Sequence, residues 1–242
     1  MALIIGGTRG LGWELAVAAH GLGIRPVVVG RPKREVMPPL KIGDTEVERH
    51  EARIETERGA GELMDTFRVN PNIGFPYLFF VAGSRLQGKL VDHFEIYAPE
   101  VIATGINGLM NTVGHFHKRK GSPYHLIVVT STTSYKIKKD ETVYGMVKAA
   151  QAQFTRNFAN ELLSQLPGSR VLLVNPAGMK TPFWEGSGVD TSAFLDPRAV
   201  ADHVWQTIQH QQRGALDPFT ELNIERDATG QPVLSYGAKA PM

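Results

Sequence analysis

The chain has 242 residues, within the usual size of one α/β domain, and its 42% hydrophobic residues suffice for a substantial core. Its 26 basic and 24 acidic side chains leave a net charge of +2, which argues against a nucleic-acid-binding or membrane-surface protein. The absence of cysteine excludes disulfides and thiolate metal sites. We therefore expect a single domain over residues 1–242.

The first residues bear on location, because they already predict a strand. Ala2–Ile5 is a short apolar run that stops at Gly6, so we expect no signal peptide. No apolar run elsewhere approaches the ~18–20 residues that a membrane-spanning helix needs. These features predict a cytoplasmic protein that does not associate with membranes.

Strands and helices alternate in the first half of the chain. After the first strand, the patterns predict a helix over 11–20, strands over 25–29 and 46–54, a helix over 59–68 and a strand over 77–82. Pro32, Pro38 and Pro39 argue against a full helix between the second and third strands. We expect that helix to be truncated.

The alternation continues in the second half. The patterns predict helices over 99–118, 142–165 and 196–212, strands over 126–130 and 170–174, and a C-terminal hairpin around 227–230. The strands YLFFVA and LIVVT are continuously apolar, as is typical of parallel strands covered on both faces. The predicted fold is α/β, a doubly wound parallel sheet flanked by helices.

A glycine turn separates the first strand from the first helix. Gly6, Gly10 and Gly12 let the backbone and the helix N-terminus approach a pyrophosphate, which predicts a dinucleotide site. Arg9 and Arg31 lie where the adenosine ribose would be. After the second strand there is no acidic residue until Glu35. We interpret the intervening Lys33 and Arg34 as solvated side chains. Cations without a carboxylate favour NADP(H) over NAD(H), since arginine can bind a 2′-phosphate with two donors.

A second group of residues predicts proton transfer. Tyr144 and Lys148 stand one helical turn apart, and Ser131 follows a predicted strand. A tyrosine can donate a proton to an alkoxide if its pKa falls toward working pH, and a neighbouring ammonium favours the tyrosinate. A serine hydroxyl can polarise a carbonyl oxygen.

In these motifs the chain resembles the short-chain dehydrogenase/reductase superfamily, over nearly its whole length. The matching pieces are Gly6-xxx-Gly10-x-Gly12, Asn107, Ser131, Tyr144-xxx-Lys148, and Asn175-Pro176-Ala177 with Thr181. The resemblance implies a Rossmann-like fold and an oxidoreductase that acts on a small carbonyl or alcohol substrate. It also implies a homodimer or homotetramer paired through the helices over 99–118 and 142–165.

The resemblance assigns roles to individual residues. It implies catalysis by Asn107, Ser131, Tyr144 and Lys148, with Tyr144 as general acid or base, Lys148 also on the nicotinamide ribose and Asn107 anchoring a relay water. The residues implied to contact the cofactor are Gly6, Thr8, Arg9, Gly10, Leu11, Gly12, Arg31, Ala82, Gly83, Tyr144, Lys148, Pro176, Ala177 and Thr181. Departures from the family pattern are Phe80-Val81 before Ala82-Gly83, Ala52 or Arg53 where the family has an acid, and Ala177 in place of a glycine.

Other interpretations remain open. A sensor or scaffold protein that binds NADP without turnover is the main alternative, and an isomerase or lyase that uses a transient hydride is another. His115 and His117 do not share a helix face, so we expect no metal site. Asp140 and Glu141 read as solvated. Phe183 and Trp184 are candidates for a lid, and pocket-lining positions are expected near Arg85, Tyr135, Met179 and Trp184.

Overall fold

The computed structural model describes residues 1–33, 38–67, 75–84 and 86–239. Within these residues, eight strands form one sheet in the order β10-β9-β8-β7-β6-β1-β2-β5. Neighbouring strands run parallel except β10, which pairs antiparallel with β9. The strands are β1 (Ala2–Ile5), β2 (Pro26–Gly30), β5 (Glu48–Glu51), β6 (Tyr77–Phe80), β7 (His125–Val129), β8 (Arg170–Pro176), β9 (Phe219–Arg226) and β10 (Pro232–Tyr236).

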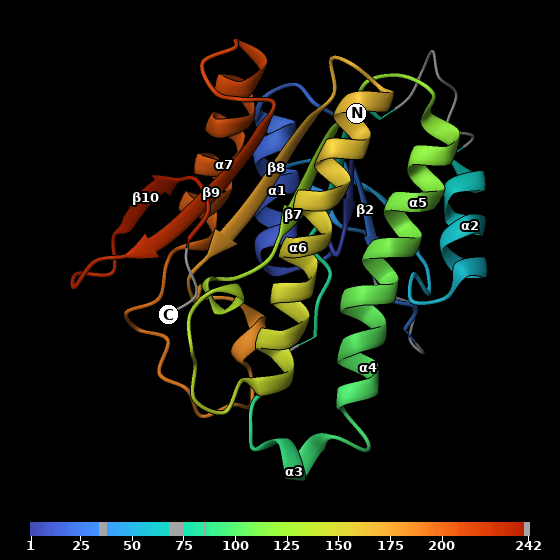
Figure 1. Ribbon diagram of the computed structural model, residues 1–242. Coiled ribbons are helices and arrows are strands. Elements are labelled where there is room, and N and C mark those ends of the chain that lie inside the picture. Colours follow the sequence, from blue (N-terminus) through green and yellow to red (C-terminus); the bar gives the residue numbers. More distant parts are fainter. Residues whose placement is uncertain (34–37, 68–74, 85, 240–242) are drawn as a thin grey trace.

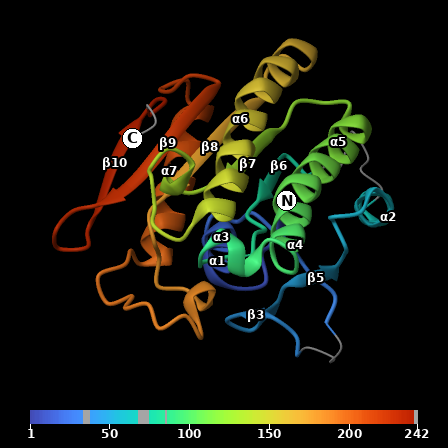
Figure 2. The same cartoon turned by 60° about the horizontal axis from the view of Figure 1, so that its bottom comes forward.

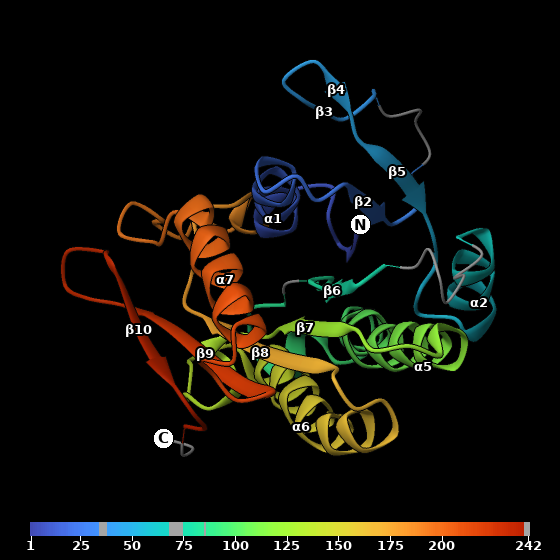
Figure 3. The same ribbon diagram turned by 90° about the horizontal axis from the view of Figure 1, so that it is seen from above.

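Helices cover both faces of this sheet (Figures 1 and 3). On one face lie α1 (Gly10–Gly21) and α7 (Pro197–Gln212); on the other lie α2 (Glu57–Thr66), α4 (Ala98–Ile102), α5 (Gly108–Lys120) and α6 (Thr142–Gln165). Successive strand residues point to opposite cores, as a strand's period of two requires. Ile4 packs with the α1 and α7 residues, whereas Leu3 and Ile5 pack with those of α2, α5 and α6. The predicted doubly wound, Rossmann-like fold is confirmed.

Local signals explain where several helices begin and end. Asp196 caps α7 by accepting a hydrogen bond from the Arg198 N–H at 2.9 Å, and Pro197 occupies the first turn. Thr56 caps α2 by accepting from the Gly59 N–H at 3.0 Å. Gly121 ends α5 with φ +56°, a left-handed conformation that glycine adopts without strain.

The structure differs from the predicted element pattern in two places. Between β2 and β5 the described residues form no helix but a small hairpin, β3 (Lys41–Ile42) with β4 (Thr45–Glu46), which projects from the body in Figure 3. The helix predicted over 99–118 is confirmed in extent, since α4, η1 (Ala103–Asn107) and α5 follow one another without a break, but η1 is a wide π-helical turn that the sequence did not predict. A short helix, α3 (Leu90–His93), precedes this segment. The predicted C-terminal hairpin is confirmed in β9 and β10.

The strand order places a ligand-binding edge. β1 lies between β2 and β6, so the chain winds away from β1 in both directions. Ligands of such sheets bind at the carboxyl ends of the strands, where the winding reverses. The arrow of β8 points to the bottom of Figure 1, and Figure 2 turns this edge toward the viewer.

Candidate active site

Ser131 lies just beyond the carboxyl end of β7. Its backbone is extended, and its side chain caps a short 3-10 helix, η2 (Thr132–Ser134). The Ser131 Oγ accepts from the Thr133 N–H at 3.2 Å and lies the same distance from the Thr133 hydroxyl. These contacts hold the hydroxyl at the ligand-binding edge, on a turn whose Thr130 N–H is bonded to Val174 of β8.

Tyr144 stands in the first turn of α6, beside Ser131. Burial raises the pKa of its phenol above the ordinary value, the negative charge of Glu141 raises it further, and a hydrogen bond with Ser131 acts in the opposite direction. The sequence had predicted a lowered pKa. That expectation is wrong, because desolvation and the charge of Glu141 outweigh the hydrogen bond with Ser131. The phenol therefore stays protonated, in the form that can donate a proton.

Lys148 is buried one turn further along α6. Its Nζ lies 5.6 Å from the centre of the Tyr144 ring and donates to the Gln151 amide oxygen at 2.9 Å and to the Val129 carbonyl at 3.4 Å. Burial lowers the pKa of Lys148 to about 8. The ammonium lies close to the backbone of Gly83, since a Cβ added at that glycine would lie 3.5 Å from Nζ.

Gln151 is a site residue that the sequence analysis missed. Its side chain is buried, and its amide N–H donates to the Gly105 carbonyl at 2.8 Å while its oxygen accepts from Lys148. The bridge joins α6 to the π-helical turn η1. The only sequence signal was a polar residue three positions after Lys148, on the same helix face.

Asn107 does not join this group. Its side chain is exposed at the end of η1, whereas Thr104, Gly105 and Gly108 are buried. The π-helical turn shifts the register of the helix, so that the Gly105 carbonyl and not the Asn107 side chain faces α6. A Cβ at Gly105 would lie 2.3 Å from a Val147 methyl, which explains the close approach of the two helices. The Asn107 side chain therefore lies apart from the Lys148–Gln151 contact, and its role in anchoring a relay water stays a prediction.

Glu141 is a second residue whose place was missed. It was expected to be solvated, but its carboxylate accepts from the Thr133 hydroxyl at 2.9 Å and its charge acts on Tyr144. Asp140 beside it adopts φ +58°, and its carbonyl accepts from the Gly88 N–H at 2.8 Å. This contact ties the loop before α6 to the loop after β6.

The glycine turn fits closely against β6. A Cβ at Gly6 would lie 2.6 Å from the Ala82 nitrogen, and one at Gly12 would lie 2.2 Å from the Gly6 carbonyl oxygen. Gly10 approaches Thr181, with 3.4 Å between its added Cβ and the threonine Cβ. The glycine turn therefore packs directly on the backbone after β6 and approaches the Thr181 side chain after β8, which leaves its own backbone open to a dinucleotide.

The other predicted cofactor residues lie around the glycine turn. The Thr8 side chain packs against Gly30, where a Cβ would meet its methyl group at 2.8 Å. Leu11 is buried in the core, so it can offer only its backbone to a ligand. Arg9 is exposed at the start of α1. Pro176 ends β8, and Ala177 follows with its N–H bonded to the Ile224 carbonyl at 2.8 Å.

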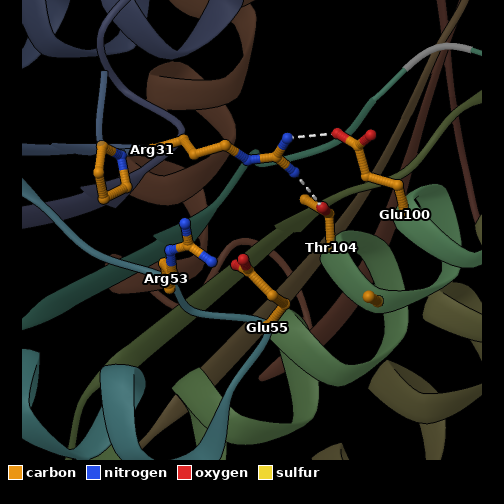
Figure 4. A pocket seen from close by; sticks show the side chains of 7 residues that line it. Arg31, Arg53, Glu55, Glu100 and Thr104 are labelled. Carbon is orange, nitrogen blue, oxygen red and sulfur yellow. Dashed lines mark hydrogen bonds and ion pairs between the residues drawn. The ribbon is translucent and has the colours of Figure 1, made fainter. Parts of the chain in front are cut away.

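Two adjoining cavities open at the carboxyl ends of β1, β2 and β5. A narrow apolar slot of about 50 Å³ lies among Gly6, Val29, Ile54 and Ala82. A polar cavity of about 270 Å³ adjoins it, and its lining residues include Arg31, Arg53, Glu55, Glu100 and Thr104 (Figure 4). The apolar slot suits a flat adenine ring and the polar cavity suits a ribose with its phosphate, so the residues present fit an adenine dinucleotide.

An aromatic group adjoins Tyr144 on the other side. The Phe183 ring lies 5.8 Å from the Tyr144 ring, Trp184 packs edge-on against Phe183 at 5.4 Å, and Phe194 packs against Trp184 at 5.1 Å. Met179 pairs with Leu195 in an isolated bridge. The three rings therefore form an aromatic wall beside Tyr144.

Two further residues, Tyr135 and Arg85, were predicted near the substrate pocket. Tyr135 is buried, and its hydroxyl donates to Glu225 of β9 at 3.0 Å, so it anchors the turn that carries Ser131. Arg85 lies outside the described residues.

The two histidines of α5 have separate partners. His115 contacts Glu57 and Arg119, whereas His117 contacts Gln165 and Tyr124. Over the described part of the chain, no three histidine, aspartate or glutamate side chains are grouped as a metal site would need. Nor is any helix there both long enough and apolar enough to cross a bilayer.

Comparisons with known proteins agree with this geometry. The family model for short chain dehydrogenases matches residues 1–191. An uncharacterised oxidoreductase of Staphylococcus aureus strain MW2 is 25% identical over 214 residues, covering 84% of this chain and 88% of that protein. The ligand-free aldohexose dehydrogenase of Thermoplasma acidophilum superposes with a TM-score of 0.75 at 16% identity, covering 92% of this chain and 91% of the other. An alcohol dehydrogenase of Thermococcus sibiricus, complexed with 5-hydroxy-NADP, gives 0.73 at 20% identity, covering 96% and 98%.

The fold and the residues at its carboxyl edge define a nicotinamide-dependent oxidoreductase. Since the family model covers most of its length, the chain belongs to the short-chain dehydrogenase/reductase family. Enzymes of this family use NAD(P) and act on small molecules.

Proposed function

We propose that this protein is an NADPH-dependent reductase of small ketones or aldehydes, and the corresponding alcohol dehydrogenase in reverse. The observation that carries the proposal is the convergence of Ser131, Tyr144 and Lys148 beside the backbone surface of Gly83. A bound NADPH would supply the hydride. The chain must then polarise the carbonyl, deliver a proton to its oxygen and exclude competing water.

Tyr144 is the proposed proton donor. The phenol is protonated at neutral pH and would pass its proton to the oxygen of the reduced carbonyl. The raised pKa opposes this transfer, so the groups that stabilise the tyrosinate must offset the effect of burial. Ser131 would donate a hydrogen bond to the same oxygen and stabilise the charge that develops there. Lys148 would stabilise the tyrosinate left behind, since its ammonium lies near the ring face.

The cofactor would lie across the switch point of the sheet. Gly6, Gly10 and Gly12 would hold the pyrophosphate at the start of α1, and the apolar slot beside Ala82 would take the adenine. Lys148 would reach the nicotinamide ribose, and the segment from Pro176 to Thr181 would flank the nicotinamide. Arg9 and Arg31 favour NADPH over NADH, because both are cations near the adenosine end and the polar cavity includes Arg31.

The wall beside Tyr144 bears on the substrate. Phe183 and Trp184 present aromatic surface, and Phe183 packs against the catalytic ring itself. This wall favours carbonyl compounds with an apolar substituent over sugars or charged acids.

The chain is also proposed to assemble as a homodimer or homotetramer through α5 and α6.

The test is turnover of NADPH with a panel of ketones and aldehydes, followed by cofactor absorbance. The proposal predicts consumption of NADPH with at least one apolar carbonyl compound and loss of that activity in Tyr144→Phe. Tight NADPH binding without turnover on a broad panel would instead favour a protein that binds the cofactor as a sensor or scaffold.

A further inference from the structure

The mouth of the polar cavity is crossed by a side-chain contact. Arg31, which follows β2, forms an ion pair with Glu100 of α4 and donates to the Thr104 hydroxyl of η1 at 2.5 Å. Figure 4 shows the guanidinium reaching across to both partners, with Arg53 and Glu55 on the neighbouring wall. The arginine proposed to bind the adenosine end of the cofactor is therefore already engaged by a carboxylate.

The two contacts of Arg31 differ in character. Thr104 is buried, with 6% of its surface exposed, and it sits on the π-helical turn that also carries Gly105. Arg31 and Glu100 are 46% and 54% exposed, so water screens their attraction. A phosphate carries more charge than a carboxylate and accepts two parallel hydrogen bonds from a guanidinium. It can therefore displace Glu100 from Arg31 while the Thr104 contact still orients the arginine.

We propose that Glu100 sets cofactor discrimination by competing with the 2′-phosphate of NADP(H) for Arg31. This inference rests on the proposed function. In this structure Glu100 holds Arg31 over the cavity. When a 2′-phosphorylated nucleotide enters, the phosphate takes the place of the carboxylate. A nucleotide without this phosphate leaves the ion pair intact and gains nothing from Arg31.

The competition predicts opposite effects for the two partners of the ion pair. Glu100→Gln frees Arg31 and removes a negative charge beside the phosphate. It should tighten binding of adenosine 2′,5′-bisphosphate by about two- to fivefold, the range expected for an exposed ion pair. Arg31→Ala should weaken that binding by about ten- to a hundredfold. Glu100→Gln should not alter the affinity for 5′-AMP, which differs from the bisphosphate only in lacking the 2′-phosphate.

The experiment is isothermal titration calorimetry of both nucleotides and of NADPH with the purified full chain, at about pH 7.5 so that the phosphate carries its second charge. In Arg31→Ala/Glu100→Gln, the gain from the glutamine should vanish, because the residue for which Glu100 competes is absent. Glu161→Gln is the matched control, since it removes one exposed charge from α6, away from the cavity. It should leave all affinities unchanged.

The outcomes separate this inference from the proposed function. If NADPH and both nucleotides fail to bind the wild-type chain, both proposals fall. If they bind and Glu100→Gln alters the two nucleotides equally, or still tightens the bisphosphate when Arg31 is absent, only the competition is refuted. Weaker 5′-AMP binding in Glu100→Gln would also overturn it, since Glu100 would then be a ligand of the ribose hydroxyls.

Discussion

Gln151 accepts a hydrogen bond of 2.9 Å from Lys148 inside the protein, and no water is needed to satisfy the ammonium on that side. The same amide donates to the Gly105 carbonyl of η1. The ammonium is thereby fixed between α6 and the end of β7, where Val129 supplies a second acceptor. Gln151 is a positioning residue in this arrangement, because it acts on the reacting groups only through Lys148.

The first prediction concerns pH dependence. Since the pKa of Lys148 is lowered to about 8, carbonyl reduction should fall as pH rises through that value and the ammonium loses its charge. Gln151→Leu removes an acceptor from the charged form, so the alkaline limb of the kcat profile should move to lower pH. Gln151→Glu adds a negative partner and should move it to higher pH.

A purely structural role for Gln151 would lower stability without moving the pH profile. The profiles of the wild type and both variants, recorded with denaturant midpoints, separate the two roles. If the alkaline limbs of the kcat profiles coincide in all three proteins, the positioning role of Gln151 is contradicted.

The second prediction concerns the stability cost of Lys148. Its folded pKa of about 8 lies below the ordinary 10.5, so between these values the unfolded chain binds more protons and stability rises with pH. Below pH 8 the full penalty of a buried charge applies, about 3 kcal/mol at most. Lys148→Met should therefore stabilise the protein at pH 7 by about 1–2 kcal/mol after the lost hydrogen bonds are counted.

Urea unfolding of the wild type and Lys148→Met at several pH values tests this prediction. The advantage of the variant should shrink as pH rises from about 8 to about 10.5, as the wild-type ammonium loses its charge in the folded state. A Lys148→Met protein that is less stable than the wild type at pH 7 would show that the ammonium stabilises the fold.

The third prediction uses two glycines of one helix. A Cβ at Gly12 would lie 2.2 Å from the Gly6 carbonyl oxygen, so Gly12→Ala must displace the backbone of the glycine turn. We expect a loss of about 2–4 kcal/mol in unfolding free energy and no measurable NADPH binding. Gly21→Ala, at the other end of α1 where a Cβ meets nothing within 4 Å, should be neutral or slightly stabilising. Equal effects at both positions would contradict the role given to the turn.

The sequence predicted the sheet and most helices because their patterns are local. The helix over 142–165 agrees with α6 at both ends, since its apolar face and its flanking residues are set by the sequence itself. The prediction that Ser131 and Tyr144 lie close together also depended on local patterns, because Ser131 follows a predicted strand and Tyr144 lies in the first turn of a predicted helix. Positions that depend on packing between elements were harder to predict.

Asn107 and Gln151 illustrate that difficulty. A regular helix over 99–118 would have a different register from the one that η1 imposes, and nothing in the sequence reveals a π-helical turn. Gln151 reads as an ordinary polar helix residue until Gly105 is seen to approach it. The raised pKa of Tyr144 likewise reflects burial by segments far away in the sequence.

The fourth prediction concerns assembly. Met110 of α5 and Met146 of α6 are large apolar side chains that are about half exposed, at 52% and 49%. If these helices pair between subunits, light scattering at micromolar concentration should report a dimer or a tetramer, and Met110→Lys should shift the protein toward the monomer. A wild-type monomer under these conditions would contradict the proposed pairing.

The central claim is that the Tyr144 hydroxyl delivers the proton during carbonyl reduction. The most direct measurement is single-turnover oxidation of bound NADPH by an apolar ketone in the wild type and in Tyr144→Phe, with NADPH affinity determined for both proteins. The account predicts that the rate falls by about a hundredfold or more while cofactor affinity changes little, because only the proton donor is lost. An unchanged rate in Tyr144→Phe would contradict it.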